Sequence, residues 1–374
     1  MQIKSNFDGG NIIVESLDDP SNIRLQIRKD HQSDFYQWFY FELTGASGQK
    51  VTLRITNAGG ASYTEGWSGY RPVVTDDGEN WVRIDADYAD GELVFSHKVT
   101  RDAVRFAYFV PFSMERHQAL VKKVSQHPNV QHEILGQTLD GQDMDLLIIG
   151  DGASKKFNIW FIARQHPGET MAEWWMEGLF DRLLDADDEI ARTLLDQCRI
   201  YVIPNMNPDG STRGHLRTNA AGMNLNRAWA APSMDQSPEV FLVRRKMHET
   251  GVDFHMDVHG DEALPYNFLA GFESIPSLDQ TQLEKYKLFQ ETLDRVAAEF
   301  QTVHGYPVNP PESSDLRKCT DYTAESFGCA AMTLEMPFKD NADNPDIIVG
   351  WSPEKCRQLA KDCLEALSLT LTGL

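Results

Sequence analysis

The stretch Phe157–Thr170, FNIWFIARQHPGET, carries the strongest structural signal in the chain. Its first seven residues are a nearly continuous apolar run, which is typical of a central strand covered on both faces. A short polar loop follows, and a helical pattern is expected at about 170–184. A strand that leads through a loop into a helix is the unit of α/β folds, so this stretch predicts an α/β domain.

Strand and helix signals alternate through the rest of the second part of the chain. Further strand signals fall at 199–204, 252–258 and 330–335, and helix signals at about 238–250, 281–300 and 353–369. This alternation predicts a mixed or parallel sheet. Ligands in such folds bind at the carboxyl ends of the strands, so we expect the chemistry at that edge.

The first part of the chain, residues 1 to about 112, has a different pattern. Val51, Leu53 and Ile55 alternate with polar residues, which is the period of a strand with one buried face. The aromatic segments 34–43 and 104–110 are further strand candidates. Short strands that are separated by turn sequences and lack helical periodicity predict an antiparallel β-sandwich or barrel.

The two patterns meet at Pro111-Phe112-Ser113, where Ser113 can cap a helix. We therefore expect one domain at 1–112 and a second at 113–374. A chain of 374 residues is long enough for two hydrophobic cores. The predicted fold class is a mixed-sheet α/β domain preceded by an antiparallel β-sandwich.

Charge and composition exclude several classes of function. With 35 basic and 56 acidic residues the net charge is −21, so we expect no nucleic acid as a partner. No apolar run reaches the roughly 18–20 residues of a membrane span, and the first residues lack the apolar core of a signal peptide. We expect a cytoplasmic protein without membrane contact. Its five cysteines form no C-x-x-C pair and are expected to be reduced and buried. The sequence leaves the oligomeric state open.

Three side chains near predicted strand ends have the chemistry of metal ligands. His166 and Glu169 lie in the loop after the strand at 157–163, and His259 ends the alternating segment VDFHMDVHG, before a glycine that leaves room for a ligand. Each motif alone more often has a structural role. Two imidazoles and a carboxylate with an open fourth position, however, are the ligand set of a catalytic zinc, so the three together predict one Zn²⁺ per chain.

Polar side chains also accompany two other strands. The loop after the strand at 199–204 contains Arg217, Asn226 and Arg227, and an arginine fork binds carboxylates or stabilises an oxyanion. Glu335 ends an apolar strand, where a buried charge is costly unless it is paired or serves as a general base. A solvated loop and a glutamate that reaches solvent are the alternatives. Asp257 or His255 could support a metal ligand from behind or satisfy polar groups of the core, and the sequence favours the second role.

The motifs HPGE, NPDG, R-x(n)-NR, DVHG and TLEMPF, in this order, resemble the carboxypeptidase A-like zinc metallocarboxypeptidase family. The resemblance is closer to the cytosolic carboxypeptidase branch, in which a β-sandwich precedes the catalytic domain. It covers essentially the whole chain, including the junction FAYFVPFS. Each motif alone is modest, but five in the order of the family are specific.

The resemblance implies the roles of the central residues. His166, Glu169 and His259 correspond to the zinc ligands. Glu335 matches the general base, and Arg217 matches the arginine that polarises the scissile carbonyl. The implied enzyme is a metallocarboxypeptidase that hydrolyses the C-terminal bond of a peptide or protein with zinc-activated water.

The resemblance also implies how the substrate is bound. Asn226 and Arg227 match the pair that holds the terminal carboxylate, and Tyr322 is the candidate for the tyrosine that closes over the substrate. Branch members that remove glutamate carry a basic residue in the side-chain pocket. Arg317 and Lys318 are candidates for a preference for acidic C-terminal residues, although the sequence favours surface charges at both positions.

Two other functions remain as alternatives. A zinc amidohydrolase or deacylase of N-acyl amino acids would share the fold and the metal triad; the Asn226-Arg227 pair, together with assays of peptides against N-acyl amino acids, discriminates between the two. A binding protein with an inactive second domain would have no need to keep Glu335 among apolar neighbours. A serine hydrolase and a P-loop enzyme are excluded, because neither signature is present.

Overall fold

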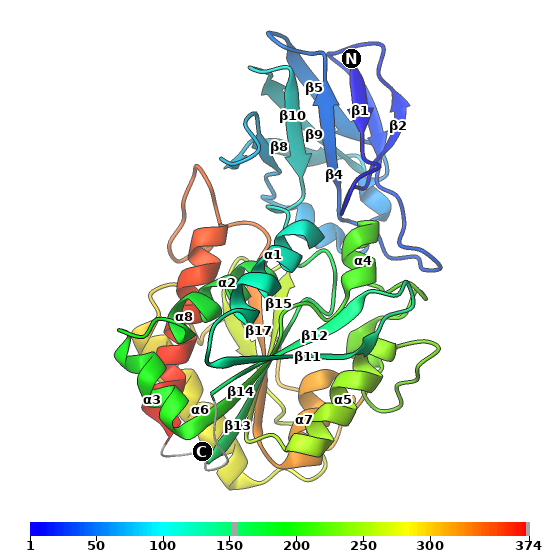
Figure 1. Ribbon diagram of the computed structural model, residues 1–374. Helices are drawn as coiled ribbons and strands as arrows, with labels where there is room; N and C mark the ends of the chain where they lie inside the picture. Colours follow the sequence, from blue (N-terminus) through cyan, green and yellow to red (C-terminus); the bar gives the residue numbers. More distant parts are fainter. Residues whose placement is uncertain (151–155, 372–374) are drawn as a thin grey trace.

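The computed structural model describes residues 1–150 and 156–371. In Figure 1 a β-rich part, built from the strands β1 to β10, stands above a larger part in which helices surround a sheet. The predicted fold class, a mixed-sheet α/β domain after an antiparallel β-sandwich, is confirmed. Within the described ranges, no helix is both long and apolar enough to cross a membrane.

Two five-stranded sheets make up the first part. One has the order β1 (Gln2–Lys4), β4 (Tyr40–Thr44), β10 (Ala103–Ala107), β6 (Val73–Thr75) and β7 (Val82–Arg83). The other has the order β2 (Ile13–Ser16), β3 (Ile23–Gln26), β5 (Lys50–Ile55), β9 (Glu92–Lys98) and β8 (Ala86–Ala89). The pairings are antiparallel except that of β3 with β5. The 3₁₀ turns η1 (Ala58–Gly60) and η2 (Thr64–Trp67) follow β5.

The sequence pattern located some of these strands better than others. The predicted alternation is that of β5, whose Val51, Leu53 and Ile55 are fully buried. The prediction of a strand at 34–43 is wrong for residues 34–39. The backbone of this segment bonds to turns and side chains rather than to one neighbouring strand; the N–H of Tyr36, for example, donates to Ser62 Oγ.

A seven-stranded mixed sheet forms the centre of the second part. Its order is β11 (Val130–Gln137), β12 (Asp143–Ile149), β14 (Cys198–Ile203), β13 (Phe157–Ala163), β15 (Phe254–Asp261), β17 (Ala330–Pro337) and β16 (Phe268–Ala270). The four strands from β14 to β17 run parallel to one another. The pairings of β11 with β12, of β12 with β14 and of β16 with β17 are antiparallel. The predicted strands are β13, β14, β15 and β17. The edge strands β11 and β16, and also β12, were not predicted, although β12 ends in the apolar run LLII.

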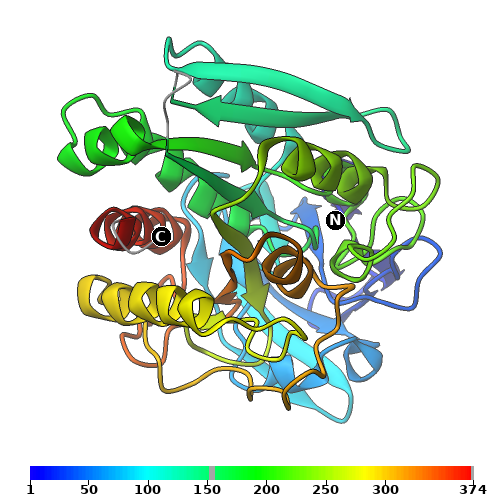
Figure 2. The same ribbon diagram turned by 90° about the horizontal axis from the view of Figure 1, so that it is seen from below.

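Helices cover both faces of this sheet (Figure 2). One layer contains α2 (Met171–Leu183), α3 (Glu189–Gln197), α6 (Gln280–Val296) and α8 (Pro353–Thr370), which pack against one another. The other face carries α5 (Pro238–Thr250) and α7 (Cys319–Phe327). The shorter α4 (Pro208–Arg213) and η3 (Leu225–Arg227) lie in the connection after β14, and α1 (Met114–Ser125) opens the second part, with Ser113 Oγ accepting from the N–H of Arg116 as predicted.

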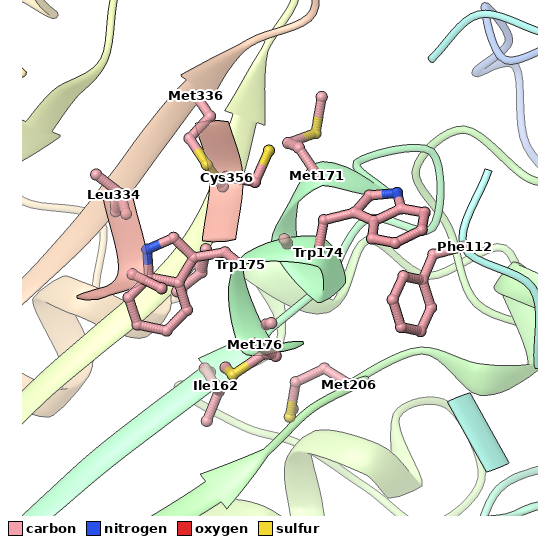
Figure 3. Packing of buried hydrophobic residues seen from close by; sticks show 14 of the residues in the cluster. Phe112, Ile162, Met171, Trp174, Trp175, Met176, Met206, Leu334, Met336 and Cys356 are labelled. Atoms are coloured by element: carbon pink, nitrogen blue, oxygen red, sulfur yellow. The ribbon is translucent and has the colours of Figure 1, made fainter. Parts of the chain in front are cut away.

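The helix α2 packs on the face of the sheet, close to the carboxyl ends of its parallel strands. Figure 3 shows its Met171, Trp175 and Met176 packed among buried side chains of β13, β17 and α8. Gly260 on β15 lies against the first residue of this helix. A Cβ atom at position 260 would come within 2.5 Å of Met171 Sδ. This glycine therefore makes room for α2, not for a ligand as the sequence suggested.

Candidate active site and metal centre

The three predicted metal ligands converge at the carboxyl ends of β13 and β15. His166 and Glu169 lie in the loop between β13 and α2, and His259 lies on β15. The Oε1 atom of Glu169 is 2.7 Å from His166 Nδ1, and its Oε2 atom is 2.7 Å from His259 Nδ1. The two Nδ1 atoms are 3.2 Å apart. All three side chains are buried, so three electron-rich groups share one small enclosed space.

The outer nitrogens of both imidazoles show that this space suits a cation. His166 Nε2 lies 3.0 Å from the amide oxygen of Asn224, and His259 Nε2 lies 2.9 Å from a carboxylate oxygen of Asp257. These oxygens only accept, so each Nε2 carries a hydrogen, and when a ring is neutral its lone pair lies on Nδ1, which faces the shared space. The 3.2 Å separation of the Nδ1 atoms is close to the roughly 3.3 Å edge of a tetrahedron with zinc–nitrogen distances of about 2.0 Å. The donor set therefore fits zinc.

Electrostatics act in opposite directions on the members of this triad. Burial, followed by the positive charge of Arg217, lowers the pKa of His166 to about 4, so this ring is neutral at pH 7 as a metal ligand must be. Burial also lowers the pKa of His259, but Asp257 and Glu169 outweigh it and raise that pKa above its usual range. Burial raises the pKa of Glu169, whereas the two histidines lower it and keep the carboxylate ionised.

The loop that carries His166 is held in an uncommon conformation. Arg164, directly after β13, has a φ of +58°, which is rare for a residue with a side chain. Its guanidinium donates to the carbonyl oxygens of Pro167 (2.9 Å) and Phe112 (2.9 Å) and pairs with Glu173 on α2. Glu173 in turn lies 2.7 Å from His117 on α1. This buried network keeps the chain turned so that His166 and Glu169 face β15.

Glu335 lies beside the triad on the neighbouring strand. It is in register with His259 in the β15–β17 pair and is 7% exposed. Its Oε2 atom has no hydrogen-bond partner among the described residues, and its Oε1 atom is 3.3 Å from the hydroxyl of Tyr306. Burial raises the pKa of Glu335 well above its usual range, against the opposing charge of His259. A carboxylate in this setting is a stronger base than one in water.

Arg217 faces the same space from a loop without regular secondary structure. Its guanidinium lies over the rings of Phe35 (5.6 Å) and Tyr63 (5.4 Å), both of which belong to the first part of the chain. Burial lowers its pKa, but Tyr63 and Glu169 outweigh this and raise it. The hydrogen bond from Arg217 to Asp30 comes from the backbone N–H, and no described residue accepts one from the guanidinium, so its donors are available.

Asn226 and Arg227 lie together on η3, close to the start of α7. The Oδ1 atom of Asn226 accepts from the N–H of Cys319 (2.8 Å), which leaves the amide Nδ2 free to donate. Arg227 is partly exposed and lies 3.8 Å from Asp315, and its Nη1 atom donates to the carbonyl oxygen of Asn226 (2.6 Å). Arg227 therefore keeps donors that can meet an anion at the rim of the site.

Tyr322, the tyrosine that the sequence suggested, lies on α7. Its hydroxyl lies 2.8 Å from His248 on α5, and Arg244 lies over its ring. The tyrosine at Glu335 is Tyr306, whose hydroxyl donates to Asp261 (2.6 Å). Sequence reasoning missed Tyr306 because it lies in an irregular loop, between glycine and proline residues, that has no periodic signal. Tyr306 is therefore a second candidate, beside Tyr322, for the tyrosine that covers the substrate.

Asp257 holds one of the predicted ligand histidines, which is not the role that the sequence favoured for it. The sequence favoured a role in satisfying the core, but its carboxylate holds His259 and also accepts from Gln165 Nε2 (2.5 Å). Asp257 and His259 are two residues apart on one strand and therefore share a face. That spacing was the signal that could have identified Asp257 as the partner of the ligand histidine.

Comparison with known proteins places this geometry in a family. Residues 3–109 match the model of the cytosolic carboxypeptidase N-terminal domain, and residues 117–366 match that of the zinc carboxypeptidases. A protein of Zymomonas mobilis without an assigned function is 50% identical over 369 residues, covering 98% of this chain and 96% of its own length.

Solved structures agree along the full length. A metallo-carboxypeptidase from Burkholderia cenocepacia superimposes with a TM-score of 0.97 at 43% identity, covering 100% of both chains. A metallo-carboxypeptidase from Pseudomonas aeruginosa does so with a TM-score of 0.98 at 42% identity, again over 100% of both. With its two matched regions and the His–Glu–His triad, this chain belongs to the zinc carboxypeptidase family, in the branch that carries a cytosolic carboxypeptidase N-terminal domain.

Proposed function

We propose that the chain releases single residues from the C-terminus of peptides at the site formed by His166, Glu169 and His259. The observation that carries this proposal is the convergence of these buried ligands beside Glu335, which is in register with His259 on the adjacent strand. Zinc held by this triad would activate water and polarise a carbonyl. The arrangement supports metal chemistry and a base acting within one enclosed space.

The side chains around the triad support specific roles. Glu335 takes a proton from the attacking water and passes it to the leaving amine, because its Oε2 atom has no competing partner among the described residues. Arg217 donates to the scissile carbonyl oxygen as negative charge develops there, since its guanidinium is not engaged by an acceptor in the described part of the chain. Asn226 and Arg227 bind the terminal carboxylate and limit cleavage to the last peptide bond.

A relative supports a site for carboxylates. The Pseudomonas aeruginosa metallo-carboxypeptidase was solved in complex with (2-guanidinoethylmercapto)succinic acid, a small dicarboxylic acid with a guanidino group. A free carboxylate is what distinguishes the end of a peptide from its interior. The Asn226-Arg227 pair of this chain supplies donors of the kind that such a group requires.

The proposal includes a preference for acidic C-terminal residues. Of the two basic candidates, Arg317 is largely exposed and binds Asp315 through two nitrogens (2.7 and 2.9 Å), so Lys318 is the side chain left to meet an acidic group. Lys318 also precedes α7, where its neighbour Cys319 bonds to Asn226. This contact brings Lys318 close to Asn226 and Arg227, the two residues proposed to bind the terminal carboxylate.

Two further parts of the proposal concern organisation and location. We take residues 1–112 and 113–374 as the two domains, because β10 ends at Ala107 and α1 begins at Met114. We place the enzyme in the cytoplasm, because its N-terminal region matches a cytosolic carboxypeptidase domain and Cys319, Cys329, Cys356 and Cys363 are buried free thiols. Cell fractionation with an antibody against the chain tests this location.

A peptide panel tests the proposed function. Peptides that differ only in the last residue are incubated with zinc-loaded protein, and the released amino acids are quantified beside N-acyl amino acids. Release of single C-terminal residues, lost with the metal and absent for peptides with an amidated C-terminus, supports the carboxypeptidase reading. Turnover of N-acyl amino acids alone would favour the deacylase, and equal release of leucine and glutamate would remove the acidic preference.

A further inference from the structure

The loop that carries Arg217 is irregular and is bonded within its own domain as well as to the first one; the N–H of Gly168, for example, donates to the carbonyl oxygen of Leu216 (2.9 Å). The loop runs from the end of α4 to η3, and residues 214–224 form neither helix nor strand. A catalytic arginine must nevertheless hold its guanidinium within a fraction of an ångström of the productive position. The partners of this loop therefore decide how well the site is formed.

The backbone of the loop is held by one buried carboxylate from the first domain. Asp30 is 3% exposed. Three consecutive N–H groups donate to it, those of Leu216 (2.7 Å), Arg217 (2.8 Å) and Thr218 (2.9 Å). The hydroxyl of Thr218 is a fourth donor at 3.1 Å. Successive N–H groups that enclose an anion form a nest, and hydrogen bonds to a charged acceptor are about twice as strong as neutral ones.

The side chain of Arg217 is held by the same domain. The rings of Phe35 and Tyr63 lie 5.6 and 5.4 Å from its guanidinium carbon, which is cation–π distance. Asp30 contacts only the backbone N–H of Arg217 and not its guanidinium. The first domain therefore orients the arginine without occupying the donors that a carbonyl oxygen would need.

Neighbouring contacts extend this support along the loop. The N–H of His31 donates to His215 Nε2 (3.1 Å), and Asn11 Nδ2 donates to the carbonyl oxygen of Gly214 (2.9 Å). Gly222 has a φ of +75°, and a Cβ atom there would lie 2.5 Å from the carbonyl oxygen of Gln32. The two domains thus meet backbone to backbone at both ends of the segment around Arg217.

We propose that Asp30 is a positioning residue for Arg217, so that the N-terminal β-sandwich is part of the catalytic apparatus. This inference rests on the proposed role of Arg217 at the scissile carbonyl. Asp30 does not touch the substrate. It acts by fixing the backbone from which the arginine side chain extends.

The variant Asp30→Asn tests this role. The amide keeps the size of the side chain but replaces one accepting oxygen with a donor that faces backbone N–H groups. We expect kcat to fall by about 10- to 100-fold, with KM for the peptide and zinc content unchanged. Asp34→Asn is the matched control, because Asp34 lies on the same segment with a 97% exposed side chain and should leave kcat as it is.

A double-mutant cycle separates positioning from general stability. In an Arg217→Ala background, Asp30→Asn should change kcat by less than about twofold, because the arginine it orients is absent. A full further loss in that background, or an unchanged kcat in Asp30→Asn alone, overturns the positioning role. If instead Arg217→Ala itself keeps the wild-type kcat, the proposed function of Arg217 fails first.

A milder variant covers the case in which Asp30→Asn does not fold. Thr218→Val removes only the hydroxyl that donates to Asp30 and keeps the shape of a fully buried side chain. A reduction in kcat of roughly two- to fivefold is expected, and it should vanish in the Arg217→Ala background. An unchanged kcat in Thr218→Val would then overturn the proposal.

Discussion

The two sides of the active site are held in different ways. On the metal side, His259 and Glu335 lie on neighbouring parallel strands, and His166 is fixed by a buried ion-pair network in the same domain. On the arginine side, Arg217 lies in an irregular loop, and three consecutive N–H groups of this loop donate to Asp30, from the other domain. The contrast indicates that one sheet can position the metal ligands and the base of a site, while the contact between two domains positions an arginine that binds the substrate.

The largest effect on kcat is expected from replacing Glu335, a change that should stop turnover but leave zinc binding intact. In Glu335→Gln, the side chain can no longer accept a proton from water, so kcat should fall on the order of 10³-fold. The ligand triad is untouched, so the variant should still bind about one zinc per chain. Metal analysis and single-turnover kinetics on the same sample measure both quantities. Wild-type turnover in this variant would remove Glu335 from the mechanism.

The support of the metal side should depend on pH through His117. Burial lowers the pKa of this histidine, but Glu173 and Asp145 outweigh it and raise the pKa to about 9. A folded pKa above the unfolded value of about 6.5 stabilises the fold below pH 6.5, and this contribution is lost as the pH rises through 9. The shift corresponds to about 3 kcal/mol.

Urea unfolding of the zinc-saturated protein measures this dependence. In the wild type, His117 should contribute about 3 kcal/mol more to the free energy of unfolding at pH 6 than at pH 9. This pH-dependent contribution should be absent from His117→Gln, because glutamine does not titrate in this range. An equal pH dependence in both proteins would assign the network a role that does not involve the charge of His117.

A smaller effect is expected from the partner of a ligand. Asp257→Asn removes the negative charge that holds His259, and loss of such a partner typically weakens metal binding by about 10- to 100-fold. Competition with a chelator gives the zinc affinity. Asp253→Asn, at the opposite end of the same strand segment, should bind zinc as the wild type does. If both variants bind alike, Asp257 does not act through the metal.

The smallest effect should discriminate between two tyrosines. Tyr306→Phe removes the hydroxyl that donates to Asp261 and lies near Glu335, and kcat/KM should fall by roughly three- to tenfold. Tyr322→Phe should leave kcat/KM unchanged, because its hydroxyl bonds to His248 on α5. A loss in the second variant and not in the first would reverse the assignment.

The sequence predicted the metal side much better than the arginine side. A continuous apolar run located β13, and an alternating one located β15, so the ends of both strands and their histidines followed from periodicity. Asp30 and Arg217 are 187 positions apart and lie in segments without a period, so no local pattern connects them. Tyr63 and Phe35 were missed for the same reason. Tertiary contacts of loops, unlike strand ends, have no signature in a single sequence.

The bonds that end on Asp30 also bear on how the protein acquires activity. They join positions 186 to 188 residues apart, whereas His166 and His259 are 93 apart, so the contacts to Asp30 close the longer loop. A chain whose second domain is complete but not joined to the first can already gather its metal ligands, because all three lie in the second domain. Full peptidase activity would require the β-sandwich to contact the loop of Arg217. A molecule in which the two domains are not yet joined would therefore bind metal but hydrolyse peptides poorly.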